Sequence, residues 1–529
     1  MLWEPDDRFS MLAKVSHVRR DMDCCAPDSV HDPRAEQAII DRGLPPLGTD
    51  PFDQRTAQDT LTPFKQDSSA VSLHIDYDTG WGTLQSITAW DEYDVDSSQE
   101  TSRSVLDTTF LNQPQSGDSL SQELRFSNSS DRIDYMAGLY YFQQTTREFE
   151  GELSALVGDD VGVGTQIFGP QLGFIAAPGD SAIQDNVFHT DTVALFSRAT
   201  WHVGSDWHLT GGLRWSRERK EADLFVEVTS TALTARDPAT LPAPLLALLA
   251  QQGIFPPFSL LAAARPEIDE RFSRESGNVD WLASVSYDLN PDTLLFASVS
   301  TGTKSGGFNG VAGATDEREF DDEDTTSYEL GVKSTLLDAR LRINSTLFFT
   351  AITNLQSSQQ AASGLGQVTR NQGEAEVSGI DLQVDALPLP NLTLSLGLQY
   401  LDTYEFTAGP DQGLNLPFVA ELSGSLAATL VFPLAHGNLY LRSDYNVMGD
   451  HWTNSASAAQ LEAKDEQNRE NLNMALGWRN DQWNVSLWGK NLGDEAYAVQ
   501  TLTPYPVTDM DAYFLTPPRT WGMTLRYDL

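Results

Sequence analysis

The most constraining feature of this chain is a two-residue alternation of apolar and polar side chains, clearest in residues 281–309. The first half of this segment places four apolar or aromatic side chains on one face of a strand: Trp281, Ala283, Val285 and Tyr287. Residues 288–292, with Pro291 among them, have the composition of a tight turn. The second half repeats the alternation with Leu295, Ala297, Val299 and Thr301. This period predicts a β-hairpin in a sheet whose two faces meet different solvents.

The same alternation recurs along the whole chain, in about eighteen segments of roughly ten residues or more, the length that a tilted strand needs to cross a bilayer. The first segment is residues 9–20 and the last is residues 520–529. In the last segment, Arg526 and Asp528 lie on the face opposite Trp521 and Leu525. Charged side chains at regular inner positions indicate a water-filled or polar-plugged lumen rather than the dry core of a sandwich.

The connections between these segments alternate between short turns and long loops. The predicted short turns are residues 78–81, 128–131, 204–206, 288–292, 337–339, 387–391 and 480–482. The predicted long connections are residues 21–69, 148–188, 222–276, 305–326 and 492–519. One rim with tight turns and one with large loops is typical of an outer-membrane barrel, and tryptophans near many strand ends fit its aromatic girdles. A soluble β-propeller or sandwich, the alternative fold, does not need this asymmetry.

Composition argues against several other classes of protein. The net charge of -41 disfavours nucleic acid as a partner, because phosphate binding needs a basic surface. No apolar run is long enough for a transmembrane helix, and the first residues, MLWEPDDRFSML, lack the features of a signal peptide. Taken literally, that start indicates a cytoplasmic protein, but the strand pattern indicates instead that the true N-terminus is missing. The adjacent Cys24 and Cys25 are interpreted as two loop thiols or one local disulfide rather than a functional pair.

No catalytic arrangement emerges from the sequence. The 8 histidines are scattered and form no HExxH pair. His202 and His208 flank a predicted tight turn, where an interfacial role is favoured over a ligand pair. Residues 302–305, GTKS, resemble the end of a phosphate loop, but Thr303 and Ser298 stand where its glycines belong. We therefore expect no enzyme activity, no catalytic residue, no cofactor and no metal site.

The predicted outer loops contain the candidate ligand contacts. The acidic run of residues 316–324, DEREFDDED, is interpreted as a solvated loop in preference to a divalent-cation site, since EF-hand spacing is absent. Lys304, Phe308 and Asn309 begin the same loop and are the candidate ligand-binding residues. The glycines between them are expected to let the strand bend into the loop. The apolar stretch of residues 241–264 is expected to pack against neighbouring loops, or alternatively to cap the vestibule.

Seven blocks of sequence resemble, in order, the barrel of the TonB-dependent outer-membrane receptors. They are SQELRF (121–126), AGLYYF (137–142), LTGGLRWSRERK (209–220), FASVSTGTKSGGFN (296–309), TTSYELGVKSTLLDARLRIN (325–344), NQGEAEVSGIDLQ (371–383) and WGKNLGDEAY (488–497). The resemblance covers nearly the whole chain. It implies an all-β fold, a transmembrane antiparallel β-barrel of roughly 22 strands, and residues 1–529 are assigned to that barrel.

The resemblance also implies that parts of the family's architecture are missing. Counting back from the C-terminus against roughly 22 strands makes residues 9–20 about the fifth. Residues 1–3 would then end the fourth strand, and residues 4–8 would form a periplasmic turn. The family's signal peptide, TonB box, plug domain and first strands are not visible, so the chain is expected to be a partial barrel. The family usually ends in an aromatic residue, whereas this chain ends in Leu529.

The function that the resemblance implies is energy-coupled uptake of a scarce ligand across the bacterial outer membrane, most commonly a ferric siderophore. The implied partners are outer-membrane lipid and lipopolysaccharide, a siderophore-like ligand, and the TonB inner-membrane complex through the missing N-terminal part. One alternative is a passive porin or surface adhesin, and another is an inactive gene fragment. A plug-coding sequence in frame upstream of Met1 would favour the uptake receptor.

Overall fold

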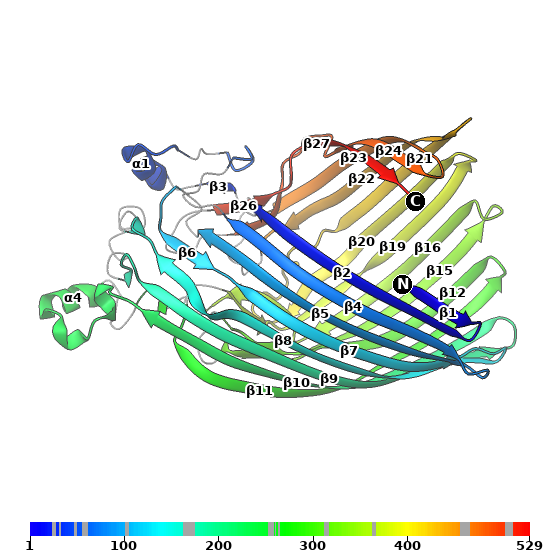
Figure 1. Cartoon of the computed structure of the whole chain (residues 1–529), viewed down its shortest axis with the longest axis horizontal. Coiled ribbons are helices and arrows are strands. Elements are labelled where there is room, and N and C mark those ends of the chain that lie inside the picture. The colour runs from blue at the N-terminus through cyan, green and yellow to red at the C-terminus, as the bar shows by residue number, and fades with distance from the viewer. Residues whose placement is uncertain are drawn as a thin grey trace.

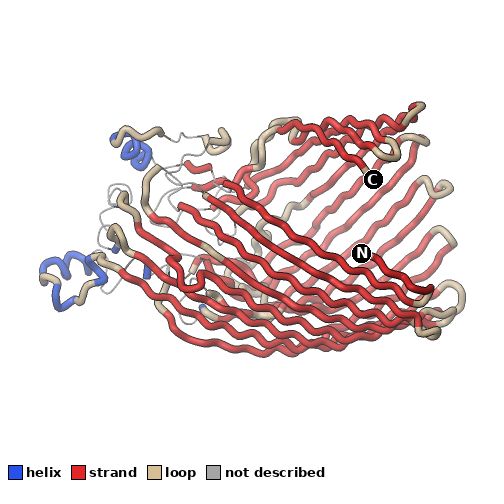
Figure 2. Tube along the Cα trace, in the orientation of Figure 1, coloured by secondary structure: helices blue, strands red, loops and turns tan. Residues whose placement is uncertain are grey.

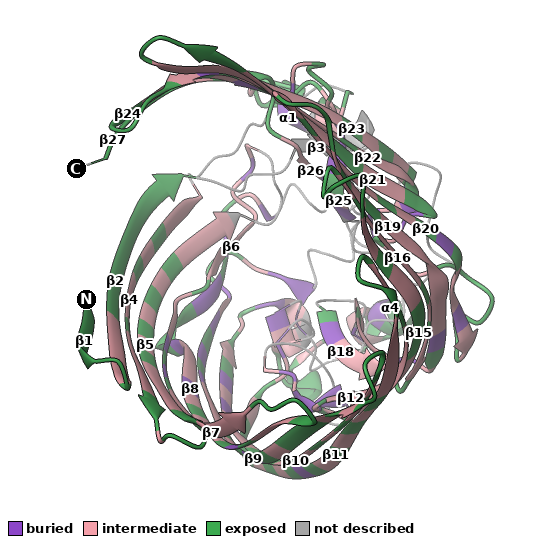
Figure 3. Cartoon of the chain, turned by 90° about the vertical axis from the view of Figure 1, so that its right-hand side faces the viewer, coloured by how far each residue is buried: buried purple, intermediate pink, exposed green. Residues whose placement is uncertain are grey.

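The computed structural model describes residues 1–23, 28–30, 33–46, 50–55, 62–100, 105–161, 175–251, 259, 261–262, 265–310, 317–361, 367–454, 466–502 and 511–528. Within this part of the chain, a single antiparallel sheet of 20 strands curves around most of a cylinder (Figures 1 and 3). The predicted all-β barrel is therefore confirmed. Cys24 and Cys25 lie outside the described residues, so the interpretation of that pair stays a prediction.

Two of the 20 strands are short, β1 (Leu2–Asp6) and β6 (Thr109–Asn112), and the other 18 form the wall. Each wall strand pairs with the next one along the chain, and each matches a predicted segment. The wall strands are β2 (Phe9–Asp23), β4 (Pro63–Asp78), β5 (Thr83–Glu100), β7 (Gln115–Asn128), β8 (Ile133–Val157), β9 (Ser181–Val203), β10 (Trp207–Thr229), β11 (Ile268–Asn290), β12 (Thr293–Lys304), β15 (Glu323–Leu336), β16 (Leu341–Thr353), β19 (Glu374–Leu389), β20 (Leu392–Ala408), β21 (Leu422–Leu434), β22 (Gly437–Trp452), β23 (Glu466–Arg479), β24 (Trp483–Lys490) and β27 (Thr520–Tyr527).

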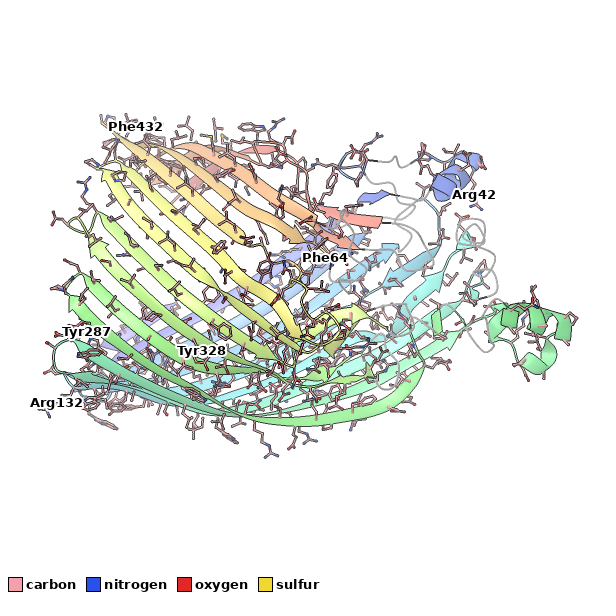
Figure 4. All side chains as sticks on the ribbon, turned by 180° about the vertical axis from the view of Figure 1, so that it is seen from behind. Arg42, Phe64, Arg132, Tyr287, Tyr328 and Phe432 are labelled. Atoms are coloured by element: carbon pink, nitrogen blue, oxygen red, sulfur yellow. The ribbon has the colours of Figure 1, made fainter. Side chains whose placement is uncertain are left out.

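The outer face of the wall is apolar, as the alternation predicts. Outward-facing side chains along β10 are exposed although they are apolar: Leu213 is 53% exposed and Trp215 is 44% exposed. Near the short-turn rim, aromatic rings pair across neighbouring strands, with 4.6 Å between the ring centroids of Trp207 and Tyr287. Figure 4 shows Tyr287 at that rim and Tyr328 further along the wall. Such a surface meets an apolar solvent, with aromatic rings at its boundary.

The two rims differ as the sequence predicts. All short turns lie at one end, on the right in Figure 1, and the long connections lie at the other. The seven predicted short turns are confirmed. Four further connections at the long-loop rim were not predicted: residues 101–114, 354–373, 409–421 and 453–465. Gly or Pro stands at several of their boundaries, as Pro114, Gly373 and Gly409 do, so this turn signal was present in the sequence.

Two predicted loops are shorter than expected, because strands extend into both of their ends. The loop predicted at residues 148–188 is shortened by β8, which runs to Val157, and by β9, which begins at Ser181. The loop predicted at residues 222–276 loses residues to β10 and β11 in the same way. In this region Arg271 Nη2 donates to Asp223 Oδ2 at 2.6 Å across the strand pair. The face that carries Asp223 and Arg271 is polar here, whereas Ala222, Leu224 and Val226 on the opposite face are at most 2% exposed. Strand pairing therefore continues where the apolar outer face has ended.

Two edges of the sheet have no strand partner within the described residues. β27 pairs with β24 alone, and β1 pairs with β2 alone. Figure 3 looks along the cylinder and shows the two edges facing each other beside the N- and C-terminal labels. β1 extends to Asp6, so the first turn is residues 7–8 rather than the predicted residues 4–8. The rings of Trp3 and Phe9, 5.3 Å apart, hold this hairpin.

Smaller elements gather at the long-loop rim. They are β3 (Asp28–Val30), α1 (Pro33–Asp41), α4 (Ala243–Gln251), β13 (Gly307–Phe308), β14 (Glu319–Phe320), β17 (Gln356–Gln360), β18 (Gln367–Asn371), β25 (Ala498–Leu502) and β26 (Asp511–Leu515). Figure 2 places the helices at this end only. None of the helices in the described residues has both the length and the apolar character needed to cross a membrane.

The apolar stretch at residues 241–264 packs against its neighbours. Leu249 of α4 is fully buried, and Leu261 is 3% exposed. Both belong to a hydrophobic cluster with Val157 at the end of β8 and Ala182 at the start of β9, and Leu241 and Leu245 pack against it. The expected packing against neighbouring loops is confirmed for these residues. Residues 252–258, 260 and 263–264 of the stretch lie outside the described residues.

Candidate functional site

The chain after β12 is fastened to the inner wall of the barrel mouth. Lys220 of β10 donates from Nζ to Ser305 Oγ at 3.0 Å and to the Gly306 carbonyl oxygen at 2.9 Å. Glu218, two residues earlier on the same face, lies 3.1 Å from the Lys220 ammonium group. Because even-numbered positions of β10 face the lumen, these contacts draw the start of the loop inward. We call residues 304–310 and 317–323 the mouth loop.

Arg274 of β11 holds the returning half of the mouth loop. Its side chain is only 13% exposed. The guanidinium donates to the Phe320 carbonyl oxygen at 2.8 Å, to Asp322 Oδ1 at 2.9 Å and to Glu319 Oε1 at 3.1 Å. The interpretation of the acidic run as a solvated loop is therefore wrong for Asp322, although Asp321 remains 81% exposed. Asp316 lies outside the described residues.

Several donors converge on Asp322. Besides Arg274, the Ser276 hydroxyl and the backbone N–H of Gly306 donate to its carboxylate, the latter at 2.8 Å. Burial acts to raise the pKa of Asp322, but these hydrogen bonds and the charge of Arg274 outweigh it and hold the pKa below the usual range. Asp322 is thus ionised, and it links both halves of the mouth loop to β11.

Gly306 is required by close approach rather than by a bend. A Cβ at this position would lie 2.1 Å from the Phe320 carbonyl oxygen and 2.8 Å from Arg274 Cζ. Any larger residue would separate the two halves of the mouth loop from Arg274. Gly306 was expected to let the strand bend into the loop. The structure shows instead that a glycine is needed here because the chain packs too closely for a Cβ.

Asn309, one of the three candidate ligand-binding residues, uses its side-chain amide within the protein. Its Nδ2 donates to the Glu317 and Thr369 carbonyl oxygens at 2.7 Å and 2.9 Å, and its Oδ1 accepts from the Thr369 N–H at 2.8 Å. Asn309 thereby joins the β13–β14 ribbon to the β17–β18 ribbon. Ligand contact by Asn309 stays a prediction, and the structure gives this residue an internal, positioning task.

The other two candidates lie beside Asn309 in the mouth loop. Lys304 ends β12 with an exposed side chain, opposite Glu323 in the β12–β15 register. Phe308 is half-buried, and its ring centroid lies 5.9 Å from that of Phe272 on β11. The mouth loop thus contains both an exposed lysine and a half-buried aromatic ring. Their contact with a ligand stays a prediction.

Two arginines of this region were not singled out from the sequence. Arg318 is 2% exposed, and its guanidinium donates to the carbonyl oxygens of Asn309 and Pro266, each at 3.4 Å. Burial lowers the pKa of Arg318, and the charge of Glu270 opposes this effect. Arg370 of β18 forms an ion pair with Glu317. Only the pairing of distant segments reveals these roles, so no local pattern in the sequence was able to predict them.

Glu148 closes the lower side of the mouth loop, beyond the aromatic boundary of β8. Burial raises the pKa of Glu148, and a hydrogen bond from Asn186 opposes the rise. Asn186 is fully buried and donates from Nδ2 to the Gly310 carbonyl oxygen at 3.2 Å. The mouth loop is therefore fastened from β9, through Asn186, as well as from β10 and β11.

The mouth combines buried and exposed charged side chains. In the mouth loop and the strands that hold it, as far as the structure describes them, no three His, Cys, Asp or Glu side chains form a group that could hold a metal ion. The buried charges of the mouth are engaged in holding loops, and exposed side chains such as Lys304 and Asp321 are left to face solvent. Such an arrangement is suited to binding a polar ligand at the entrance to a wet lumen.

An apolar-coated barrel with short turns at one rim and inward-folded loops at the other defines the class of outer-membrane receptor barrels. The chain belongs to the family described as TonB dependent receptor-like, beta-barrel, whose sequence profile matches residues 30–492. It is accordingly a protein of the bacterial outer membrane, in a family of transport receptors rather than enzymes.

Similar proteins include the pesticin receptor of Yersinia pestis, which is 23% identical over 397 residues. That match covers 73% of this chain and 48% of the relative, so the chain spans about half the length of this relative. The metal-pseudopaline receptor CntO of Pseudomonas aeruginosa is 33% identical over 150 residues, which cover 28% of this chain and 20% of that protein.

Solved structures with the same fold include the ferric yersiniabactin uptake receptor FyuA from Yersinia pestis. Its TM-score is 0.73 at 18% identity, covering 99% of this chain and 69% of that one. The ferric-catecholate import receptor Fiu from Escherichia coli has a TM-score of 0.67 at 15% identity, covering 100% of this chain and 73% of that one. At these identities the likeness establishes the fold.

Proposed function

We propose that this chain is the barrel of a receptor for energy-coupled uptake of a scarce ligand, most specifically a ferric siderophore. The observation that carries the proposal is the family match over residues 30–492, combined with a mouth loop fastened inside the lumen by Lys220 and Arg274. A passive pore gains nothing from loops held across its entrance, whereas a receptor that captures a dilute ligand needs a shaped surface there. The printed names of similar proteins, ferric yersiniabactin and ferric-catecholate receptors among them, support the ligand class.

The proposed partners follow from the same surfaces. The apolar outer wall contacts outer-membrane lipid, and the charged strand extensions above it contact lipopolysaccharide. The TonB complex of the inner membrane supplies energy through a plug domain, which we place in a segment that precedes these strands. Further strands are proposed to pair with β1 and β27, because unpaired N–H and C=O groups facing hydrocarbon each cost several kcal/mol.

The proposal assigns ligand contact to Lys304 and Phe308. An exposed ammonium group and an aromatic ring in the same loop suit a negatively charged chelate with aromatic or carboxylate donors. Loss of one charge-assisted contact is expected to weaken binding roughly 10- to 100-fold.

The test is growth and radiolabelled iron uptake by a strain that depends on this gene, supplied with defined ferric chelates. Uptake that requires both the gene and the proton-motive force is the expected result, with Lys304→Ala reducing uptake at low ligand concentration. Lys65→Ala is the matched control, since Lys65 is an exposed lysine on β4 away from the mouth loop. Uptake that persists without the proton-motive force would indicate a passive pore. DNA upstream of Met1 that encodes no plug domain would also favour a passive pore over an energy-coupled receptor.

A further inference from the structure

Four titratable side chains form one hydrogen-bonded row at the short-turn rim. His202 of β9 and His208 of β10 face each other across the tight turn, with 2.6 Å between their Nδ1 atoms. The Nε2 atom of His202 lies 2.8 Å from Asp134 Oδ2 on β8, and the Nε2 atom of His208 lies 2.9 Å from Asp288 Oδ2 on β11. The row therefore crosses four neighbouring strands.

The register of the sheet builds this row. His202 and His208 are directly opposite residues of the β9–β10 hairpin. The backbone N–H of His202 donates to the Arg132 carbonyl oxygen at 2.9 Å, on the side away from β10. The two histidines thus form a non-hydrogen-bonded pair, the type of pair in which side chains lie closest. Both occupy even positions, which face the lumen in β9 and β10.

The two aspartates decide which ring nitrogens carry hydrogen. An ionised carboxylate only accepts hydrogen bonds, so the Nε2 atom of each histidine must be the donor. In two neutral imidazoles the lone pairs are then both on Nδ1. These lone pairs point at each other across 2.6 Å, which is favourable only when a cation lies between them. That cation is either one shared proton or a metal ion.

We propose that His202 and His208 bind a divalent d-block cation, such as Zn²⁺, through their two Nδ1 atoms. Imidazole nitrogen is a preferred ligand of Zn²⁺, Cu²⁺ and Ni²⁺. A carboxylate on the far nitrogen of a metal-ligating histidine fixes its tautomer and raises its basicity, and both histidines here have one.

The remaining geometry is compatible with this ion. Two nitrogens bound tetrahedrally at about 2.0–2.1 Å lie roughly 3.3 Å apart, so small ring rotations must widen the present contact. The side chains of His202 and His208 are 21% and 24% exposed, which leaves room for water to complete the coordination. An open cavity of about 520 Å³ has Asp134 in its lining, so it adjoins one end of the row.

This site is independent of the proposed uptake function. It lies at the rim opposite the mouth loop, and it shares no residue with Lys304, Phe308 or Asn309. The bound ion would fasten β8, β9, β10 and β11 together at their short-turn ends. Sequence analysis favoured an interfacial role for the two histidines, and the aspartates that change this interpretation are 68 and 80 residues away from them along the chain.

The experiment measures Zn²⁺ binding by the full chain, folded in detergent micelles, using equilibrium dialysis. The fraction folded is checked by heat-modifiable migration on gels. The expected result is one equivalent of Zn²⁺ that is absent from the His202→Gln/His208→Gln variant. His189→Gln is the matched control, because His189 lies on the same strand but contacts Thr145 at 3.1 Å, and it should bind as the unmodified chain does.

Two further measurements keep the proposal falsifiable if the double variant folds poorly. Asp134→Asn removes one carboxylate without touching a ligand and should weaken Zn²⁺ binding about 10- to 100-fold. Cu²⁺ bound to the unmodified chain should show hyperfine coupling to two imidazole nitrogens in its electron paramagnetic resonance spectrum. Equal binding by the unmodified chain and the double variant, or no nitrogen coupling, would overturn the proposal and leave the pair with a shared proton only.

Discussion

Arg274 is the residue on which the shape of the mouth most depends. It is nearly buried and donates to Phe320, Asp322 and Glu319, which are 46, 48 and 45 residues away. Replacement by methionine removes these donors but keeps much of the side-chain volume. Because a buried carboxylate that loses its donor costs about 1–3 kcal/mol, Arg274→Met should make the mouth loop open more easily by roughly that amount.

Hydrogen exchange of residues 317–323 measures this effect. Arg271→Met is the control, since the Arg271 side chain is 69% exposed and its pair with Asp223 should contribute only about 0–1 kcal/mol. Equal loss of protection in the two variants would contradict the assigned role of Arg274. Protection should also depend on pH. The pKa of Asp322 is lowered below its ordinary value of 3.8, so its stabilisation is complete above that value and is lost as the pH falls further.

Sequence predicted the place of the candidate site better than its contacts. Lys304, Phe308 and Asn309 were found because they follow a strand in a long loop. The internal role of Asn309 depends on Thr369, which lies 60 residues further along the chain. Such a contact follows from how two loop ribbons lie inside one lumen, and neither alternation nor turn composition contains that information.

At the scale of single elements, each wall strand separates hydrocarbon from water. Leu330 of β15 is 58% exposed on the outer face, and Ser298 of β12 donates to Glu329 at 3.0 Å on the inner face. Leu330 pairs with Ala297, the neighbour of Ser298 along β12. Leu330 and Ser298 therefore lie at nearly the same depth in the membrane. Arginine facing lipid near mid-depth costs about 2–4 kcal/mol.

Leu330→Arg should therefore lower the free energy of unfolding in a bilayer by about that amount, as measured by denaturant titration of the refolded barrel. Ser298→Arg introduces the same side chain at the same depth, but into the lumen beside Glu329. Ser298→Arg should therefore change the free energy of unfolding little. Equal destabilisation by the two variants would show that the faces of β12 and β15 are assigned wrongly.

The wall strands were predictable because bilayer and lumen impose opposite demands on neighbouring residues. Beyond the bilayer the outer face meets water, while inner residues such as Leu224 and Val226 are buried at 2% exposure. The demand for an apolar outer face therefore ends there, although the hydrogen-bonded ladder does not. For this reason β8 and β9 meet as far as the Leu156 and Ser181 pair, well inside the loop that the sequence predicted. Salt bridges also join neighbouring strands in this region. One links Arg217 of β10 to Glu275 of β11, with 2.6 Å between nitrogen and oxygen.

At the scale of the whole molecule, one curved sheet carries three surfaces with separate tasks. The outer wall contacts lipid, the long-loop rim presents the mouth, and the short-turn rim carries the row of Asp134, His202, His208 and Asp288. Within the described residues, β1 and β27 are the two edges of this sheet. The alternation of apolar and polar residues predicted the strands of the wall. It could not predict how the loops divide the lumen, because the positions of the loops depend on contacts between distant strands.

The central claim is that successive residues of each wall strand meet hydrocarbon and water in turn. Single spin labels placed from Leu209 to Trp215 of β10, in a chain with Cys24 and Cys25 replaced by serine, test it directly. In the bilayer-embedded receptor, the odd positions should respond to lipid-soluble oxygen and the even positions to a water-soluble nickel chelate, with a period of two. Accessibility that lacks this period, or odd positions open to the water-soluble reagent, would contradict the account.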